Sequence, residues 1–471
     1  MNRYHPERIR QMRSTIRAQI VETILDDFDG GLMELTTEAR TAKYAKMAES
    51  AFRFFRGTAY LFYFDVADVP FPYHTPKDKP TWIQGDLHFE NFGAFRSAGG
   101  GIVYDINDFD EGYLGSYLYD LLRMSVSITL VCEALGYDEE QTDEAIHTYL
   151  KTYYRQIRRF SQRKDDVQRM LFTAEHTSGP VRKLLRKLER KNASEFLEAV
   201  TDGASALRKF SLTAEIVPAD AEERRELLAA WPEYLTTLTE TGVREDSFYA
   251  IKDVAVKHGS GTASIGLDRF YVLIEGHRDP EGADDIVLEA KEVRAPVPAY
   301  FLPYAEPFWA RYAHHGRRVA ATQRAMHHEA DPFLGWFTLN DRHFYVRERS
   351  PYKKRLKLEK IETHDCLLTT LKQMARITAK IHARADNELR DNEGILDYHA
   401  EHEIMAAMGP DPDKFADTLS LWAMNYAAQV HQDFEVFRTI AARRFDLGAR
   451  ASEAPDSGAE GLNTNAKDVR E

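Results

Sequence analysis

Cysteine is scarce in this chain of 471 residues, which contains only Cys132 and Cys366. Two cysteines exclude a disulfide scaffold and a four-cysteine zinc site, and they fit a reducing compartment. Long apolar runs are also missing: the longest, residues 124–135, is too short to span a bilayer, and the first residues contain no apolar signal core. We therefore expect a cytoplasmic protein without membrane contact.

An excess of positive charge is missing as well. The formal net charge is −13, which argues against a dedicated nucleic-acid-binding protein. Hydrophobic residues make up 43% of the chain, enough for a large core, and the length suits two or three domains or one two-lobed enzyme. Nothing in the composition indicates the oligomeric state.

Polar residues of catalytic type are concentrated in two neighbouring stretches, IQGDLHFENFG (83–93) and VYDINDFDE (103–111). The glycine-rich SAGGG between them predicts a hairpin turn joining two short strands, residues 92–96 and 102–106. Such a hairpin would bring the acidic groups of both stretches to one end of a small sheet. A solvated acidic loop is the alternative, since Asp and Asn are common turn residues.

This pattern suits phosphoryl transfer, in which an Asp accepts the proton of the incoming hydroxyl while an Asn and a second Asp hold Mg²⁺. The two stretches resemble the catalytic and metal loops of the aminoglycoside phosphotransferase and choline kinase group. The resemblance implies Asp86 as catalytic base and Asn91 and Asp108 as metal ligands. Asp105 and Asp110 are the alternatives to Asp108.

The resemblance also assigns structural residues. Asp120, in YDLLR, corresponds to a buried acid that braces the catalytic loop. Gln84 stands where that group usually has a histidine before Gly-Asp. His88 also fits the D-x-H opening of metal-dependent phosphoesterases, but the GNH segment of those enzymes is missing downstream. We therefore interpret His88 as a packing or hydrogen-bonding residue of the loop.

From residue 246 the pattern changes to strand-like runs separated by turns. Residues 261–266 (GTASIG) have the layout G-x-G-x-x-G with alanine at the middle glycine, and an ordinary hairpin turn is the alternative. Between two strands such a turn can cover phosphates, which makes Gly261, Ser264 and Gly266 candidate nucleotide-binding residues. Lys291 then sits where the third strand of a kinase small lobe carries its phosphate-contacting lysine. Two further strands, at 333–339 and 343–347, would complete a five-stranded small lobe.

A kinase-like lobe also has a helical Glu that pairs with the lysine, and the helical run 308–329 lacks one. Gln323 is the polar substitute, while Glu306 and Glu329 lie near the two ends. The helix 363–385 resembles the one that precedes the catalytic loop in these phosphotransferases, although here it follows that loop in sequence. Its His382 is predicted to support the loop.

The expected fold class is therefore α+β. We predict a two-lobed, protein-kinase-like fold in circularly permuted order, with a small antiparallel-sheet lobe and a larger, mainly helical lobe. The expected parts are listed in chain order: an N-terminal helical and aromatic segment with a linker (1–80), a large-lobe part with the catalytic and metal loops (81–245), a nucleotide-binding small lobe (246–352), helices returning to the large lobe (353–445) and a disordered tail (446–471).

The aromatic segment 46–66 is predicted to be a core helix or strand, and the role of its Arg53 and Arg56 is left open. Together with GDLHFENFG and NDFDE, this segment resembles an uncharacterised, mainly bacterial family, domain of unknown function 2252, over about residues 46–398. The family name adds no function.

The sequence thus predicts a phosphotransferase that uses ATP and Mg²⁺ and acts on a hydroxyl-bearing, small-molecule acceptor. Two alternatives stay open. One is nucleotidyl transfer (AMPylation) on the same fold. The other is a non-catalytic nucleotide-binding or scaffold module, favoured by the missing helical Glu and by Gln84 and Ala263.

Overall fold

The structure is a computed structural model that describes residues 6–191, 193–203, 207–238, 246–258, 265–277, 284–303, 305–388 and 395–447. The helices are α1 (Pro6–Leu25), α2 (Thr37–Met47), α3 (Ala51–Gly57), α4 (Ala59–Val66), α5 (Leu118–Ala134), α6 (Glu139–Ser161), α7 (Gly179–Leu188), α8 (Ala193–Val200), α9 (Ala221–Thr236), α10 (Glu306–Tyr312), α11 (His315–Met326), α12 (His364–Arg384), α13 (Ala400–Met408) and α14 (Pro412–Phe445). None of these helices is long and apolar enough to cross a membrane within the described ranges.

The strands form small antiparallel sheets, so the molecule is a mixed α/β protein. They are β1 (Thr81–Ile83), β2 (Phe92–Arg96), β3 (Ile102–Ile106), β4 (Tyr113–Gly115), β5 (Thr201–Asp202), β6 (Lys209–Phe210), β7 (Ile216–Pro218), β8 (Ile251–Lys257), β9 (Arg269–Ile274), β10 (Ile286–Val293), β11 (Gly335–Leu339), β12 (Arg342–Glu348) and β13 (Lys354–Arg355).

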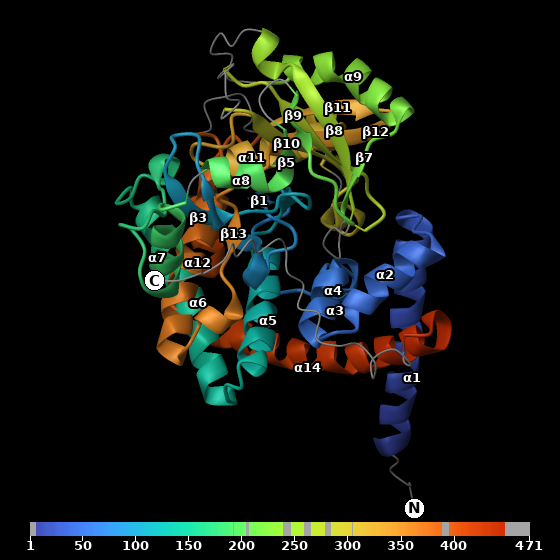
Figure 1. The fold of residues 1–471 in the computed structure, drawn as a ribbon. Coiled ribbons are helices and arrows are strands. Elements are labelled where there is room, and N and C mark those ends of the chain that lie inside the picture. Colours follow the sequence, from blue (N-terminus) through green and yellow to red (C-terminus); the bar gives the residue numbers. More distant parts are fainter. Residues whose placement is uncertain are drawn as a thin grey trace, which may run out of the picture.

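The largest sheet has the strand order β11-β12-β10-β9-β8-β7 and lies at one end of the molecule, where α9 covers one of its faces (Figure 1). The sequence predicted five strands here, and β7 is the sixth, contributed by residues that precede position 246. Successive side chains of β10 point to opposite faces of this sheet. Leu288 and Ala290 pack in the core beneath Trp231 of α9, so Glu289 and Lys291 point to the opposite face.

The predicted hairpin is confirmed with its expected bounds. β2 and β3 pair antiparallel with Phe92 opposite Ile106, and β13 adds a third strand on the β2 side. A second short pairing, β1 with β4, places Ile83 opposite Tyr113. These two pairings hold the stretches 83–93 and 103–111 side by side.

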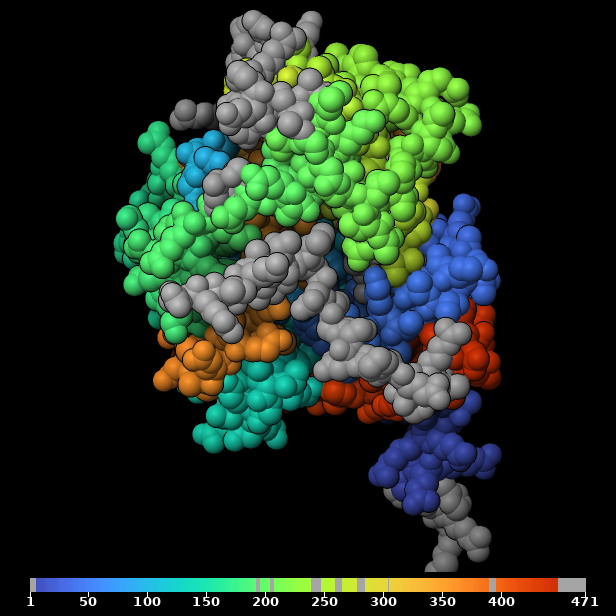
Figure 2. All heavy atoms as spheres, in the orientation of Figure 1, coloured from blue at the N-terminus to red at the C-terminus, as the bar shows by residue number. Residues whose placement is uncertain are grey.

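Helices form the rest of the core, below the largest sheet in Figure 1. The helix predicted at 363–385 is confirmed as α12, which packs against α6 and β1 although it comes last of the three in sequence. The predicted core segment 46–66 is helical, and its α3 packs against α5 and α14. The face in Figure 2 shows the N-terminal helices (blue) directly beside the β8–β9 end of the largest sheet (yellow-green).

Candidate functional site

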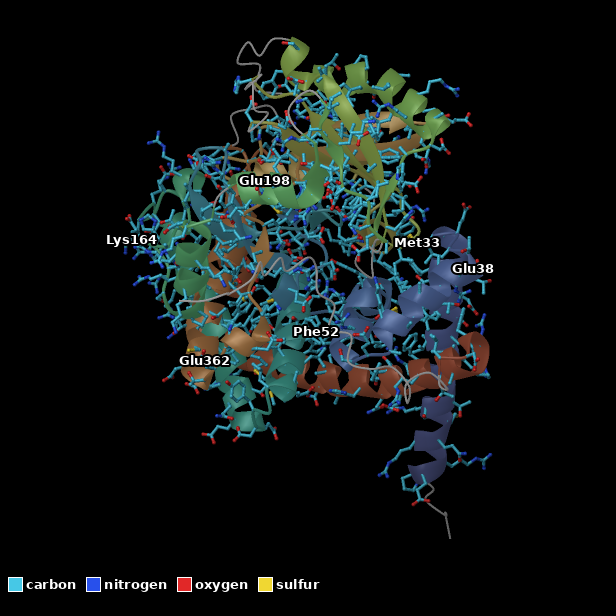
Figure 3. All side chains as sticks on the ribbon, in the orientation of Figure 1. Met33, Glu38, Phe52, Lys164, Glu198 and Glu362 are labelled. Carbon is cyan, nitrogen blue, oxygen red and sulfur yellow. The ribbon has the colours of Figure 1, made fainter. Side chains whose placement is uncertain are left out.

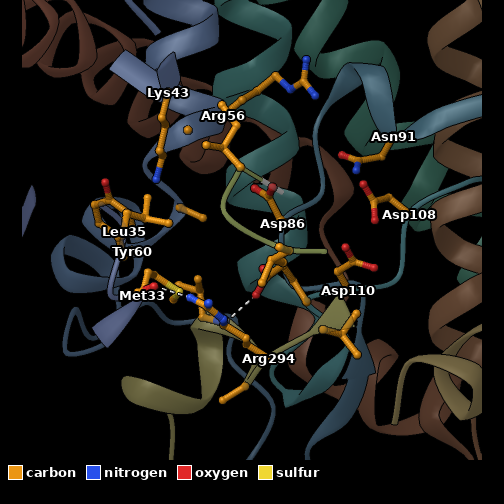
Figure 4. A pocket seen from close by; sticks show the side chains of 18 of the residues that line it. Met33, Leu35, Lys43, Arg56, Tyr60, Asp86, Asn91, Asp108, Asp110 and Arg294 are labelled. Atoms are coloured by element: carbon orange, nitrogen blue, oxygen red, sulfur yellow. Dashed lines mark hydrogen bonds between the residues drawn. The ribbon is translucent and has the colours of Figure 1, made fainter. Parts of the chain in front are cut away.

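A pocket opens where the 83–93 and 103–111 stretches meet the N-terminal helices and the end of β10 (Figure 4). Its lining includes Asp86, Asn91, Asp108 and Asp110, so four of the acidic and amide residues singled out in the sequence share one cavity. The other lining residues are Met33, Leu35, Lys43, Arg56, Gly57, Ala59, Tyr60, Gln84, Glu111, Ile265, Leu267, Val293, Arg294, Ala295 and Val297.

Asp86 is positioned by a glycine and by a buried cation. Gly85 has φ +90°, and a Cβ there would lie 2.1 Å from the carbonyl oxygen of Glu111, so a side chain at position 85 is not tolerated. The Asp86 carboxylate accepts a hydrogen bond from Nε of the fully buried Arg123. Nη2 of the same arginine donates to the carbonyl oxygen of Phe55 at 3.0 Å. Burial raises the pKa of Asp86 above its usual value, and Arg123 opposes that rise.

Gln84 connects the two stretches through both ends of its side-chain amide. Its Oε1 accepts from the backbone N–H of Asp86 at 2.9 Å, and its Nε2 donates to the carbonyl oxygen of Asp108 at 3.1 Å. Gln84 therefore fixes the spacing between the backbone segments of Asp86 and Asp108.

Asp120 lies behind this stretch at the start of α5 and is fully buried. Its carboxylate accepts hydrogen bonds from the backbone N–H groups of Gln84 (2.7 Å) and Gly85 (2.9 Å). His382 of α12 lies 3.1 Å from the same carboxylate through Nε2, while its Nδ1 lies 2.9 Å from the hydroxyl of Tyr153. These contacts link the end of α12 to the backbone that carries Asp86.

Asn91 and Asp108 face the same side of the pocket (Figure 4). The Asn91 Oδ1 accepts from the backbone N–H of His88 at 2.8 Å, which closes the turn Phe89–Asn91. Asp108 is exposed at the pocket wall. Partial desolvation raises its pKa, but the positive charges of neighbouring side chains, Lys291 first, outweigh that effect and hold the pKa below its usual value.

The three aspartates of the second stretch have different surroundings. Asp110 accepts a hydrogen bond from Lys291 through Oδ2, and its buried Oδ1 has no hydrogen-bond partner within the described residues. Asp105 is buried away from the pocket, where it pairs with Lys380 of α12 and lies 3.6 Å from His327. Asp105 therefore holds α12 to the hairpin, and Asp108 and Asp110 are the aspartates of this stretch that line the pocket.

Lys291 reaches Asp110 from β10, on the face of the sheet that turns towards the pocket. Two positions back, Glu289 accepts from Arg269 (2.9 Å) and Arg347 (2.7 Å). Two arginines thus pair with the buried Glu289, while Lys291 on the same face reaches the acidic floor formed by Asp108 and Asp110. The sequence left the partner of Lys291 open, because the helical run 308–329 that follows it lacks a mid-helix Glu, and in the structure Lys291 pairs with Asp110.

Of the glycine turn predicted at residues 261–266, the structure describes only Ile265 and Gly266, so Gly261 and Ser264 lie outside the described residues. Gly266 has φ +82°, and a Cβ there would lie 2.5 Å from Cδ2 of Leu35, so this position requires glycine. Its neighbours Ile265 and Leu267 line the pocket. The end of the turn therefore approaches the pocket and the N-terminal segment together.

Sequence reasoning gave no role to Arg56, which lines the pocket. Its Nε donates to Nε2 of His88 at 3.1 Å, and its guanidinium also contacts Glu90, which Arg355 of β13 approaches at 2.9 Å. Burial lowers the pKa of His88 well below its usual value, so His88 is neutral and accepts from Arg56. Arg53 points elsewhere and forms an exposed pair with Glu49.

The segment between α1 and α2 was also missed, and nothing in its sequence marks it as part of a site. Met33, labelled in Figure 3, accepts a hydrogen bond from Arg294 just after β10. Lys43 of α2 lines the pocket and pairs with the buried Asp29 at 2.6 Å, which Tyr60 also contacts at 3.1 Å. The N-terminal helices thus form one wall of the pocket.

Comparison with known families assigns the chain to a protein family. A model of the family described as "Uncharacterized protein conserved in bacteria (DUF2252)" matches residues 36–440. Because the match covers most of the sequence, the chain belongs to this family. No curated protein matches it. No solved structure matches it either.

Proposed function

We propose that this protein is a phosphotransferase that uses ATP and Mg²⁺ to phosphorylate a hydroxyl group on a small-molecule acceptor. The observation that carries the proposal is the cleft in which Asp86, Asn91 and Asp108 lie beside the Lys291–Asp110 ion pair. Residues from two distant parts of the chain thereby supply the groups that phosphoryl transfer requires: a base, oxygen ligands for a metal and a cation for the phosphates.

The oxygen atoms of the pocket suit Mg²⁺, which prefers carboxylate, amide and water oxygens. Asp108 presents a carboxylate whose pKa is lowered, and Asp110 has a buried oxygen without a hydrogen-bond partner among the described residues. Asn91 Oδ1 accepts one hydrogen bond and retains a second lone pair. Asn91 and Asp108 would hold the metal, with Asp110 as a further ligand, and the bound ion would neutralise phosphate charge.

We assign the remaining groups the following roles. Asp86 orients the acceptor hydroxyl and takes its proton, while Arg123 holds the carboxylate in place. Lys291 contacts phosphate oxygens from the sheet, and Gly261, Ser264 and Gly266 cover them. Asp120, His88 and His382 support the stretch that carries Asp86.

The kinase-like fold with permuted chain order is part of this proposal. Two features support it: the strand order β8-β9-β10-β12-β11, with α11 inserted between β10 and β11, and the packing of α12 behind the stretch that carries Asp86. Lobe packing, rather than chain order, would then assemble the site.

Incubation with ATP labelled separately at the α- and γ-phosphates tests the reaction. Label transferred from the γ-phosphate to a small molecule, with none from the α-phosphate, is the expected result. Retention of the α-label on the product would instead establish nucleotidyl transfer. If ATP and Mg²⁺ neither transfer label nor raise the melting temperature, both enzymatic readings are wrong.

A further inference from the structure

A second group of ligand-type side chains lies between the end of α12 and the start of α13. One ligand atom each from Asp386, His399 and Glu401 lies within 4.8 Å of the others. Oε1 of Glu388 is 3.6 Å from Nδ1 of His399. None of these residues lines the pocket that holds Asp86, so the group is separate from the proposed phosphotransferase site.

Asp386 and Glu401 are buried, His399 is partly buried, and part of the group has no hydrogen-bond partner among the described residues. Asp386 is 1% exposed and Glu401 is 7% exposed. The Asp386 oxygens accept from the backbone N–H groups of Glu388 (2.9 Å) and Ala400 (3.2 Å). Oε2 of Glu401 and Nδ1 of His399 have no hydrogen-bond partner in the described part of the chain, although both atoms are inaccessible to solvent. A buried acceptor without a partner normally signals a missing ligand or proton.

The local charge is also unbalanced. Three carboxyl groups meet around Nδ1 of His399, which lies 3.7 Å from Asp386, 3.6 Å from Glu388 and 3.8 Å from Glu401, and Arg163 lies 3.6 Å from Glu388. A bound dication would balance this charge and satisfy the two unpartnered atoms together.

We propose that Asp386, His399 and Glu401 bind a divalent transition-metal ion, with Zn²⁺ the best fit. One imidazole nitrogen and two carboxylates form a donor set that Zn²⁺ accepts, whereas Mg²⁺ and Ca²⁺ prefer oxygen ligands alone. Glu388 or a water molecule completes the coordination. His399 is free for this role because it stands at the N-terminal cap of α13 without capping the helix through its side chain.

The position of the site suggests what the ion does. Asp386 follows α12 by two residues, and His382 near the end of that helix contacts Asp120. His399 and Glu401 belong to the start of α13. A metal ion would therefore clamp the end of α12 to α13 and stabilise the support of the backbone around Asp86.

Titration of the metal-stripped, tag-free full-length chain with Zn²⁺ by calorimetry tests the site. We expect one Zn²⁺ per chain, together with a higher melting temperature for the metal-loaded protein. His399→Ala and Glu401→Gln should each weaken Zn²⁺ binding at least tenfold and abolish the thermal shift. His431→Ala is the matched control, because His431 is exposed on α14 and pairs with Glu133; its binding should equal that of the wild type.

Glu401→Gln keeps the size and one oxygen of the side chain, so circular dichroism should show a folded protein even if His399→Ala misfolds. The proposal is overturned if the wild-type chain binds no stoichiometric Zn²⁺ or if Mg²⁺ binds as tightly. It is equally overturned if Glu401→Gln stabilises the metal-free protein while leaving Zn²⁺ affinity unchanged, because the carboxyl groups would then only share a proton. Nucleotide binding plays no part in this readout, so failure of the phosphotransferase proposal leaves the test intact.

Discussion

The ammonium group of Lys291 donates a hydrogen bond to the carboxylate of Asp110, which lies 181 positions earlier in the chain. Lys291 is 4% exposed, and the pair links the largest sheet to the 103–111 stretch. In the proposed reaction this lysine also contacts phosphate. Asp110 therefore positions Lys291 in the role that a helical Glu would otherwise take.

Replacing Lys291 with methionine tests this role. The substitution removes a charge-assisted hydrogen bond to phosphate, worth about 1.5–3 kcal/mol, so ATP affinity should fall about 10- to 100-fold. Calorimetric titration with ATP and Mg²⁺ measures the change. Lys357→Met, at an exposed position after β13, is the control and should bind like the wild type. Equal affinity in both variants would remove Lys291 from the site.

Replacing Asp86 with asparagine tests the proposed base. Asparagine keeps an oxygen that can accept from Arg123 but cannot take a proton, so kcat should fall about 10²- to 10⁴-fold with nucleotide affinity unchanged. Initial rates with γ-labelled ATP and calorimetry provide the two measurements. The exposed Asp68→Asn serves as the control. Wild-type turnover of Asp86→Asn would show that the base is elsewhere.

Arg123 has a structural consequence that can be measured without a substrate. Its guanidinium is buried between the Asp86 carboxylate and the rings of Phe55 and Phe62, whose centroids lie 4.1 and 5.1 Å away. Arg123→Met leaves the Asp86 charge buried without its partner, so the free energy of unfolding should fall by about 3–5 kcal/mol. Urea denaturation measures this loss.

The double variant Asp86→Asn/Arg123→Met should recover part of that stability, because the unpaired charge is then gone. A double variant whose loss equals the sum of the two single losses would show that the pair contributes no coupling.

Glu111 predicts a dependence of stability on pH. Its Oε2 accepts from the backbone N–H of Val297 at 2.5 Å, and burial raises the pKa of its carboxyl group to about 7. The folded state therefore binds more protons than the unfolded state between the unfolded pKa of 4.5 and about pH 7, so stability falls as the pH rises through this window.

Glu111→Gln removes this titration and keeps an acceptor for Val297. The variant should match the wild type near pH 4.5 and exceed its unfolding free energy by up to about 3 kcal/mol at pH 8. Urea denaturation across this pH range makes the comparison. Parallel pH profiles for the two proteins would contradict the raised pKa.

Local patterns predicted the secondary structure well. The glycine-rich SAGGG gave the β2–β3 hairpin with its bounds, because a turn between two apolar runs leaves few alternatives. The sixth strand, β7, was missed because three residues carry no alternation. Its strand character comes from pairing with β8, which is a tertiary effect.

The residues of the site were partly predictable. GDLHFEN and NDF identified Asp86, Asn91 and Asp108, which the fold brings to one pocket. The partner of Lys291 could not be derived, because three aspartates lie within six positions of the sequence. Only the folded structure shows that Asp105 pairs with Lys380 and Asp110 with Lys291. The N-terminal wall around Lys43 was equally inaccessible, since side chains that converge only in the folded state leave no local sequence pattern.

The central claim is that nucleotide phosphates bind between the 103–111 stretch and the largest sheet. A crystal structure with Mg²⁺ and a non-hydrolysable ATP analogue tests it most directly. Phosphate oxygens within contact distance of Lys291, bridged by a metal ion to Asn91 and Asp108, are the predicted result. A nucleotide bound elsewhere, with no phosphate oxygen near Lys291 and no metal at Asp108, would contradict it.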